Sequence, residues 1–246
     1  MRLARLRGPA GAEPEFHRLE GDEAVPLRGG EGRRFTLAEL LAPVTPSKVV
    51  AIARNYAAHA KELSQEIPKE PLFFLKPPSS VVGPGAAISL PDWSREVHHE
   101  AELGVVVGTR MRRVPPERVR DHLLGFTCVN DVTARDVQRA LGHFTRAKGA
   151  DGFCPIGPWI ETELPFPAEV VCRVSGAERQ RGTTDQMIFG VEALLSFLSH
   201  SMTLEPGDVV ATGTPAGVGP IRAGDVVEVE IAGLGVLSNP VVAQEP

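Results

Sequence analysis

Two glutamates separated by a single alanine, Glu100 and Glu102, lie within the segment HHEAELGVVVG. On a β-strand, alternate side chains share a face, so both carboxylates point one way while Leu103, Val105 and Val107 point the other way, toward a core. Two like charges at this distance repel each other unless a cation offsets them. The stretch therefore indicates either a site for a metal ion or the solvated outer face of a sheet, where alternating polar residues are common.

The face that carries the two acids continues with Gly104, Val106 and Gly108. A solvent-facing strand more typically mixes Lys, Thr and Arg than it places glycines after acids. Because glycine has no side chain, we expect open space beside the carboxylates, in which a substrate could lie. The two neighbouring histidines, His98 and His99, have no predicted catalytic task, and His99 is expected to face the core in a structural role.

A third acid, Asp131, ends the apolar segment FTCVND and precedes a predicted helix. Asp131 would suit the N-cap of that helix, a position for which Thr133 competes. Together with Glu100 and Glu102 it would instead supply three oxygen ligands, with no His or Cys in the set. Such a set selects a hard ion, Mg²⁺ or Mn²⁺, that keeps water in its remaining positions, and open positions are what a catalytic metal needs.

A histidine and a glutamate three residues apart, His59 and Glu62, lie in the segment NYAAHAKEL. The spacing of Tyr56, His59 and Ala60 predicts one face of a helix, with Asn55 as its N-cap. Residues three apart are neighbours on a helix, so the carboxylate could hold the tautomer of the imidazole and raise its basicity. The alternative is a structural histidine on a helix face, which is the commoner outcome for an isolated histidine.

Two further candidate residues lie in glycine-rich loops. Lys148, in AKGADGF, is either a functional cation or an ordinary exposed lysine. Thr214, in TGTPAGVG, is either a ligand contact or a simple turn threonine, and the glycines around it allow the backbone to approach a ligand closely. The residues alone leave both alternatives open.

The elements that must position these side chains are short. The chain contains 22 prolines and 25 glycines in 246 residues, which favours strands and turns over long helices. Apolar runs and alternation predict strands over 1–6, 16–21, 47–53, 72–75, 99–108, 124–130 and 169–174. Helices are predicted over 35–43 (with a Thr36–Glu39 capping box), 55–63, 133–142 and 191–202. The fold class is therefore mostly β with short helices (α+β).

The composition excludes several classes of protein. The net charge is -5 with Lys and Arg spread along the chain, which gives no nucleic-acid footprint. The N-terminal segment lacks the apolar region of a signal peptide, and no stretch is long enough to span a membrane, so we expect a cytoplasmic protein. The cysteines, Cys128, Cys154 and Cys172, form no CxxC pair, which indicates neither a zinc site nor a disulfide framework. Cys128 and Cys172 lie in apolar runs and are expected to be buried small hydrophobes. Residues 1–45 are predicted to form a small N-terminal domain and 46–246 the main domain.

Six segments occur in the order ARNYAAHAKEL, FLKP, HHEAELGVVVG, NDVTARDVQ, AKGADGFCPIGPW and GDVVATGTPAGVG. Together they resemble the fumarylacetoacetate hydrolase (FAH) family, over about residues 47–240. The resemblance implies a mixed β-sandwich roll as the catalytic domain over 46–246, a small N-terminal unit before it, and assembly as a homodimer. It also implies that Glu100, Glu102 and Asp131 bind the divalent metal.

The resemblance assigns roles to the other candidates. These are a base with its orienting carboxylate on a mobile lid (His59, Glu62), contacts to the substrate or to metal-bound water (Lys148, Thr214), and further contacts at the rim of the active site (Arg135, Gln138).

The expected substrate is a small 2-oxo acid. A divalent metal with two adjacent open positions could chelate its 2-oxo and carboxylate oxygens and stabilise an enolate. Such an enolate leads to decarboxylation, to carbon–carbon hydrolysis by a His59-activated water, or to isomerisation. Within the family, the chain is most similar to the 2-hydroxyhepta-2,4-diene-1,7-dioate isomerases and 5-oxopent-3-ene-1,2,5-tricarboxylate decarboxylases of homoprotocatechuate catabolism. The alternatives are an acylpyruvate hydrolase or oxaloacetate decarboxylase and, from another class, a catalytically silent metal- or ligand-binding protein.

Overall fold

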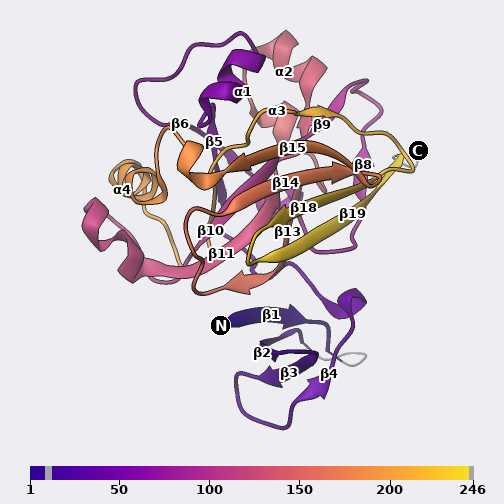
Figure 1. Ribbon diagram of the computed structural model, residues 1–246, viewed down its shortest axis with the longest axis vertical. Coiled ribbons are helices and arrows are strands. Elements are labelled where there is room, and N and C mark those ends of the chain that lie inside the picture. Colours follow the sequence, from indigo (N-terminus) through magenta and orange to yellow (C-terminus); the bar gives the residue numbers. More distant parts are fainter. Residues whose placement is uncertain (9–12, 244–246) are drawn as a thin grey trace.

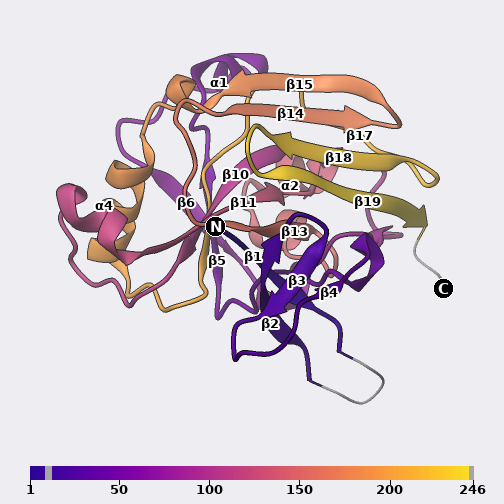
Figure 2. The ribbon, with the colours of Figure 1, turned by 60° about the horizontal axis from the view of Figure 1, so that its bottom comes forward.

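Two β-sheets pack against each other in the computed structural model, which describes residues 1–8 and 13–243 (Figures 1 and 2). Within these residues the larger sheet has eleven strands, in the order β4 (Arg33–Arg34), β3 (Glu23–Pro26), β2 (Glu15–Glu20), β1 (Arg2–Leu6), β13 (Cys154–Glu161), β11 (Leu123–Asn130), β10 (Ala101–Val107), β16 (Val209–Ala211), β5 (Val49–Ala53) and β6 (Leu72–Lys76), with β7 (Val81–Val82) also paired to β13. The second sheet has five described strands, in the order β15 (Ala177–Thr183), β14 (Glu169–Val174), β18 (Val226–Ile231), β19 (Gly235–Ala243) and β8 (Ile88–Leu90). A small sheet consists of β12 (Thr133–Ala134), β9 (Val97–His99) and β17 (Gly219–Pro220).

The helices are short. They are α1 (Ala57–Glu62), α2 (Arg135–Leu141), α3 (Thr145–Lys148) and α4 (Val191–Ser201). Segments of 3₁₀ helix occupy Leu37–Glu39, Pro78–Ser80, Pro116–His122 and Thr184–Gln186. In Figure 1, α1 and α2 lie at one end of the sheets and α4 at their side. None of the helices formed by the described residues is long and apolar enough to cross a membrane. The predicted fold class, mostly β with short helices, is confirmed.

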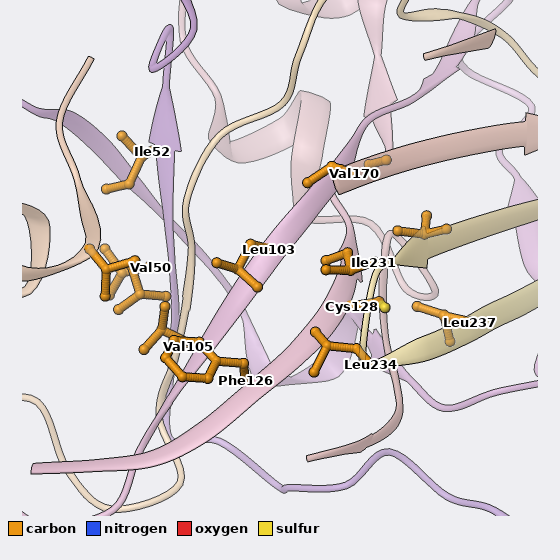
Figure 3. Close-up of a cluster of buried hydrophobic side chains, with 14 of the residues drawn as sticks. Val50, Ile52, Leu103, Val105, Phe126, Cys128, Val170, Ile231, Leu234 and Leu237 are labelled. Atoms are coloured by element: carbon orange, nitrogen blue, oxygen red, sulfur yellow. The ribbon is translucent and has the colours of Figure 1, made fainter. Parts of the chain in front are cut away.

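The main core lies between the two large sheets (Figure 3). Leu103 and Val105 of β10 and Cys128 of β11 are fully buried there, as the predicted alternation of β10 requires. They belong to one cluster with Val170 of β14 and Ile231 of β18, from the facing sheet. The apolar stripe of α4 joins the same cluster. The larger sheet, which carries the acidic strand, is thus held in place by apolar burial on its inner face.

A Leu103→Ala variant is expected to lose about 2–5 kcal/mol in the free energy of unfolding, because it leaves a cavity that the neighbouring side chains only partly fill. Urea unfolding followed by far-UV circular dichroism measures the difference. Leu37→Ala is the matched control, because this leucine is 69% exposed. The control should change the free energy of unfolding by less than about 0.5 kcal/mol. Equal losses in both variants would contradict this placement of the core.

The first four strands form a small unit that lies apart from the rest in Figure 1. β1 nevertheless continues the larger sheet, because it pairs with β13 and aligns Leu3 with Ile160. The unit has its own cluster of buried apolar residues, which are Ala4, Leu6, Leu19, Ala24 and Leu40. The predicted domain boundary at residue 45 stays a prediction, and residues 9–12 of this unit lie outside the described residues.

Two elements near the acids differ from the prediction. The strand predicted over 99–108 is interrupted at Glu100, which separates β9 from β10. The helix predicted over 133–142 begins only at Arg135, because the two residues before it pair with β9 as strand β12. It ends at Leu141, and the predicted terminator Gly142 follows with a left-handed φ of 67°, which is typical of a glycine after a helix.

Other differences lie farther from the acids. The helix predicted over 35–43 is only a 3₁₀ turn, although its predicted Thr36–Glu39 capping box is present. The strands β13 and β15 were not predicted, because prolines interrupt the first and charged side chains dominate the second. All three cysteines are free and buried, as expected for Cys128 and Cys172.

Candidate active site

Three acidic side chains meet in the interior. Glu100 lies between β9 and β10, Glu102 lies in β10, and Asp131 follows β11 directly. β10 and β11 are antiparallel neighbours that align Ala101 with Asn130, so the ends that bear the acids coincide. One oxygen from each acid lies within 4.8 Å of the others, and all three residues are buried. The burial excludes the solvated outer face that was the alternative for the two glutamates.

Buried cationic side chains surround these acids. Lys148 of α3 donates to Glu100 Oε2 at 2.9 Å and also to Asp131. Lys76, at the end of β6, donates to Asp131, and Arg135, at the start of α2, donates to Glu100. Lys148 is 3% exposed, so it is not the ordinary surface lysine that its glycine-rich loop also allowed.

The ion pairs set the protonation of two members of the cluster. Burial alone would raise the pKa of Glu100, but Lys148 and Arg135 hold this pKa well below its ordinary value. Burial alone would lower the pKa of Lys148, but Asp131 and Glu100 hold it above its ordinary value. Glu100 and Lys148 therefore stay charged at neutral pH.

For Glu102 the nearby Lys148 and a backbone hydrogen bond lower the pKa, but they do not outweigh the effects that raise it. Among the residues that the structure describes, its carboxylate forms no ion pair with a Lys or Arg, and its Oε2 accepts a hydrogen bond from the backbone nitrogen of Gly213 at 2.7 Å. Burial, Asp131 and Glu100 raise the pKa of Glu102 well above its ordinary value. A divalent cation among the three acids would offset this repulsion, and the all-oxygen donor set fits Mg²⁺ or Mn²⁺.

The glycines after the acids do not provide the expected space, so that prediction is wrong. A Cβ at Gly104 would lie 2.6 Å from the side chain of Val129 and 3.0 Å from that of Thr127, both on β11. A Cβ at Gly108 would lie 2.8 Å from the backbone nitrogen of Leu124. These glycines permit close packing of the neighbouring strand, and the space for a substrate lies elsewhere.

The open space lies beside α1 and α2. A cavity of about 530 Å³ is bounded by these helices, the end of β5 and the acidic cluster. The predicted site residues that line it are His59, Glu100, Glu102, Arg135, Gln138, Lys148 and Thr214. Glu62 and Asp131 are not among the lining residues, but they contact His59 and Lys148, respectively. The structure therefore brings all the predicted site residues to one place.

His59 and Glu62 are in contact, as their spacing predicts. His59 Nδ1 lies 3.0 Å from Glu62 Oε2, so this nitrogen donates to the carboxylate and leaves Nε2 as the basic nitrogen. Glu62 Oε1 accepts a hydrogen bond from the backbone nitrogen of Gly217 at 2.9 Å. Both carboxylate oxygens are thus held, and the imidazole is oriented at the wall of the cavity.

Asn55 does not cap α1, contrary to the prediction. The N-cap is Tyr56. Asn55 Nδ2 instead donates to the carbonyl oxygens of Phe189 at 3.0 Å and Thr212 at 2.8 Å, and Asn55 Oδ1 accepts from the backbone nitrogen of Phe189. Asn55 therefore ties the start of α1 to the loop that carries Thr214.

Lys76 is a site residue for which the sequence predicts no role, although its motif FLKP is part of the resemblance. Lys76 is fully buried and donates to Asp131 and to the carbonyl oxygen of Val132. The signal in the sequence was a single lysine at the end of an apolar strand. A lysine buried there needs a partner of opposite charge, which would have pointed to the acids. At the rim, Arg135 donates to Gln138, so these two predicted substrate contacts are linked.

Comparison with known proteins gives the same family along most of the chain. Residues 48–242 match the family model described as fumarylacetoacetate (FAA) hydrolase C-terminal. A 5-carboxymethyl-2-hydroxymuconate delta-isomerase from Mycobacterium smegmatis is 44% identical, with a TM-score of 0.91 and 100% of both chains covered. A 2-hydroxyhepta-2,4-diene-1,7-dioate isomerase from Mycobacterium marinum is 41% identical, with a TM-score of 0.88 and 100% of both chains covered.

Two other similar proteins are named for different reactions. A mitochondrial oxaloacetate decarboxylase of Dictyostelium discoideum is 44% identical over 198 residues, which are 77% of this chain and 91% of the relative. A fumarylpyruvate hydrolase from Pseudomonas aeruginosa, solved in complex with Mn²⁺ and pyruvate, is 35% identical with a TM-score of 0.76, over 80% of this chain and 90% of that one. Because the family match spans most of its length, this chain belongs to the fumarylacetoacetate hydrolase family.

Proposed function

We propose that this protein is a divalent-metal-dependent enzyme that acts on small 2-oxo or 2-hydroxydienoate acids. The observation that carries the proposal is the buried Glu102, which lacks an ion-pair cation among the described residues and lies beside Glu100 and Asp131. The same cavity wall contains the oriented base His59. A carboxylate set that needs a cation, next to an oriented base, supports an enzyme over a catalytically silent binding protein.

Mg²⁺ or Mn²⁺ held by Glu100, Glu102 and Asp131 would polarise the 2-oxo group of a bound acid. His59 supplies the general base, because its Nε2 can accept a proton from water or from a substrate carbon. Glu62 stabilises the imidazolium that this transfer produces and holds the ring in place.

The remaining residues bind and orient the substrate. Lys148 and Arg135 bring positive charge to the cavity wall, which favours a carboxylate-bearing ligand. Gln138 and Thr214 add polar contacts at the same wall. A cavity of about 530 Å³ is the size of a small-molecule site.

We assign the reaction to the 2-hydroxyhepta-2,4-diene-1,7-dioate isomerase and 5-oxopent-3-ene-1,2,5-tricarboxylate decarboxylase group of aromatic catabolism. The similarity to the two isomerases covers the whole chain, including the N-terminal unit, and this supports the assignment. Acylpyruvate hydrolysis or oxaloacetate decarboxylation is the second candidate. The His59–Glu62 pair, which the activation of water requires, and the similarity to a decarboxylase and a hydrolase support it. The homodimer and the cytoplasmic location stay predictions.

A substrate panel tests the proposal. The full chain is assayed with dienoates of the hydroxymuconate type, oxaloacetate and acylpyruvates, in Mg²⁺, in Mn²⁺ and in EDTA, and the products are identified by NMR. We expect EDTA to abolish turnover, either metal to restore it, and the dienoate to be turned over fastest. Full activity in EDTA would contradict the metal dependence, and faster turnover of oxaloacetate or an acylpyruvate would favour the second candidate.

A further inference from the structure

A buried glutamine from the facing sheet, Gln180 of β15, contacts the peptide between the two candidate metal-binding glutamates. Its Oε1 lies 3.0 Å from the backbone nitrogen of Ala101 and 2.9 Å from Nδ1 of His99. Its Nε2 lies 2.7 Å from Oγ1 of Thr214 and 2.8 Å from the carbonyl oxygen of Pro215. The amide oxygen thus has two hydrogen bonds and the amide nitrogen has two, which is its full capacity.

The backbone partners fix the direction of each bond. The nitrogen of Ala101 can only donate and the carbonyl oxygen of Pro215 can only accept, so the oxygen and nitrogen of the Gln180 amide are distinguished. His99 must then donate from Nδ1, which agrees with the structural role expected for it. Thr214 accepts from Gln180, and its own hydrogen goes to the carbonyl oxygen of Ala101, 2.8 Å away.

These bonds hold both backbone polar groups of Ala101. Gln180 accepts from its N–H, Thr214 donates to its carbonyl oxygen, and Gln180 also donates to Thr214. Ala101 lies between Glu100 and Glu102, so the position of its peptide groups fixes the backbone from which both glutamate side chains extend. We propose that Gln180 is a positioning residue, which fixes the spacing of the two glutamates for a divalent cation and directs the hydroxyl of Thr214. The inference rests on the proposed metal dependence.

The same bonds limit what Thr214 can offer to a ligand. Its hydrogen is committed to Ala101 and one lone pair to Gln180, so the remaining lone pair can only accept a hydrogen bond. Thr214 lines the cavity. It therefore recognises a donor, such as the hydroxyl of an enol or a water molecule, rather than a carboxylate oxygen.

A purely structural role for Gln180 makes a different prediction. Gln180 belongs to the five-stranded sheet and Ala101 to the larger one, so their hydrogen bond also links the two sheets. If that link were its only task, a substitution would lower the melting temperature and leave the metal affinity of the folded protein unchanged. The test therefore needs a measurement of metal binding beside one of stability.

Gln180→Met removes the amide without adding a charge that could itself attract a cation. We expect the affinity for Mn²⁺, measured by calorimetry on the metal-free full chain, to fall about 10–100-fold, the effect usual for groups that orient metal ligands. Gln186→Met, the same change at an exposed glutamine, is the matched control and should bind Mn²⁺ as the wild type does. Circular dichroism and thermal unfolding establish that each variant is folded.

A second pair of variants keeps the test decisive if Gln180→Met does not fold. Thr214→Val removes the hydroxyl that holds Ala101 at nearly constant volume, and Thr214→Ser keeps it. We expect the valine variant to lose about tenfold in Mn²⁺ affinity and the serine variant to remain near wild type. Unchanged affinity in folded Gln180→Met or in Thr214→Val would overturn the positioning role. A wild type that binds no Mn²⁺ would instead overturn the proposed function.

Discussion

A Glu102→Gln variant is expected to melt at a higher temperature than the wild type when metal-free, and to bind Mg²⁺ and Mn²⁺ about 100-fold more weakly or worse. Both effects follow from the loss of one negative charge. Burial raises the pKa of this carboxyl group and its charge repels Asp131 and Glu100, so a neutral amide of the same shape stabilises the protein in EDTA. The amide also removes a charged ligand, which costs at least as much affinity as the loss of a group that orients ligands.

The gain in stability depends on pH. The folded state keeps the proton of Glu102 to a higher pH than the unfolded chain, because the pKa is raised above its ordinary value of 4.5. As the pH rises through that ordinary value toward the raised one, the wild type loses stability and the glutamine variant does not. The advantage of the variant is therefore expected at about pH 8 and absent at about pH 4.

Thermal unfolding in EDTA at the two pH values, together with Mn²⁺ calorimetry, measures both effects. Glu163→Gln, at an exposed glutamate, is the control and should change neither quantity. If Glu102→Gln melted like the wild type at both pH values and bound Mn²⁺ equally well, Glu102 would be neither a repelled carboxylate nor a ligand.

A His59→Ala variant is expected to lose about 10²–10⁴-fold of its activity toward acylpyruvates, the loss typical of a missing general base. Hydrolysis needs water to be deprotonated at the substrate, and Nε2 of His59 is the basic nitrogen oriented at the cavity. Decarboxylation of oxaloacetate breaks a carbon–carbon bond without this deprotonation, so it should decrease less. A larger loss for hydrolysis than for decarboxylation would identify His59 as the general base. A residue that only shapes the cavity would affect both rates equally.

Steady-state kinetics with both substrates, in saturating Mn²⁺, measures this ratio. His200→Ala, at an exposed histidine of α4, is the control and should leave both rates unchanged. Glu62→Gln tests the orienting carboxylate: we expect a smaller loss of activity than in His59→Ala, because the imidazole remains but the carboxylate charge beside it is gone. An equal decrease of both reactions in His59→Ala would contradict the role of the histidine.

The acidic triad could be predicted from the sequence because its signals are local. Alternation on the predicted strand over 99–108 places Glu100 and Glu102 on one face, although the structure interrupts that strand at Glu100. Asp131 directly follows β11, which pairs with β10. The contact between His59 and Glu62 could also be predicted from the sequence, because residues three apart on a helix are neighbours.

The rest of the site depends on contacts between segments far apart in the chain. Asn55 suits an N-cap locally, but its side chain bonds to Phe189 and Thr212, which a local pattern does not contain. Gln180 lies in a strand whose sequence shows no alternation of apolar and polar residues. It contacts Ala101 only when the two sheets pack against each other. The space predicted beside Gly104 was wrong for the same reason, since the neighbouring strand fills it.

The acidic side chains, the cationic side chains and the His59–Glu62 pair come from elements that are far apart in the chain, between α1 and the loop that carries Thr214. Because only folding brings these elements together, the site exists only in the native state. A cation that binds there has no comparable site on the unfolded chain, and it acts as a folding ligand. Each tenfold excess of free cation over its dissociation constant adds about 1.4 kcal/mol to the free energy of unfolding. With the proposed metal dependence, Glu102 would lower the stability of the metal-free protein and thereby link the free energy of unfolding to the concentration of free metal.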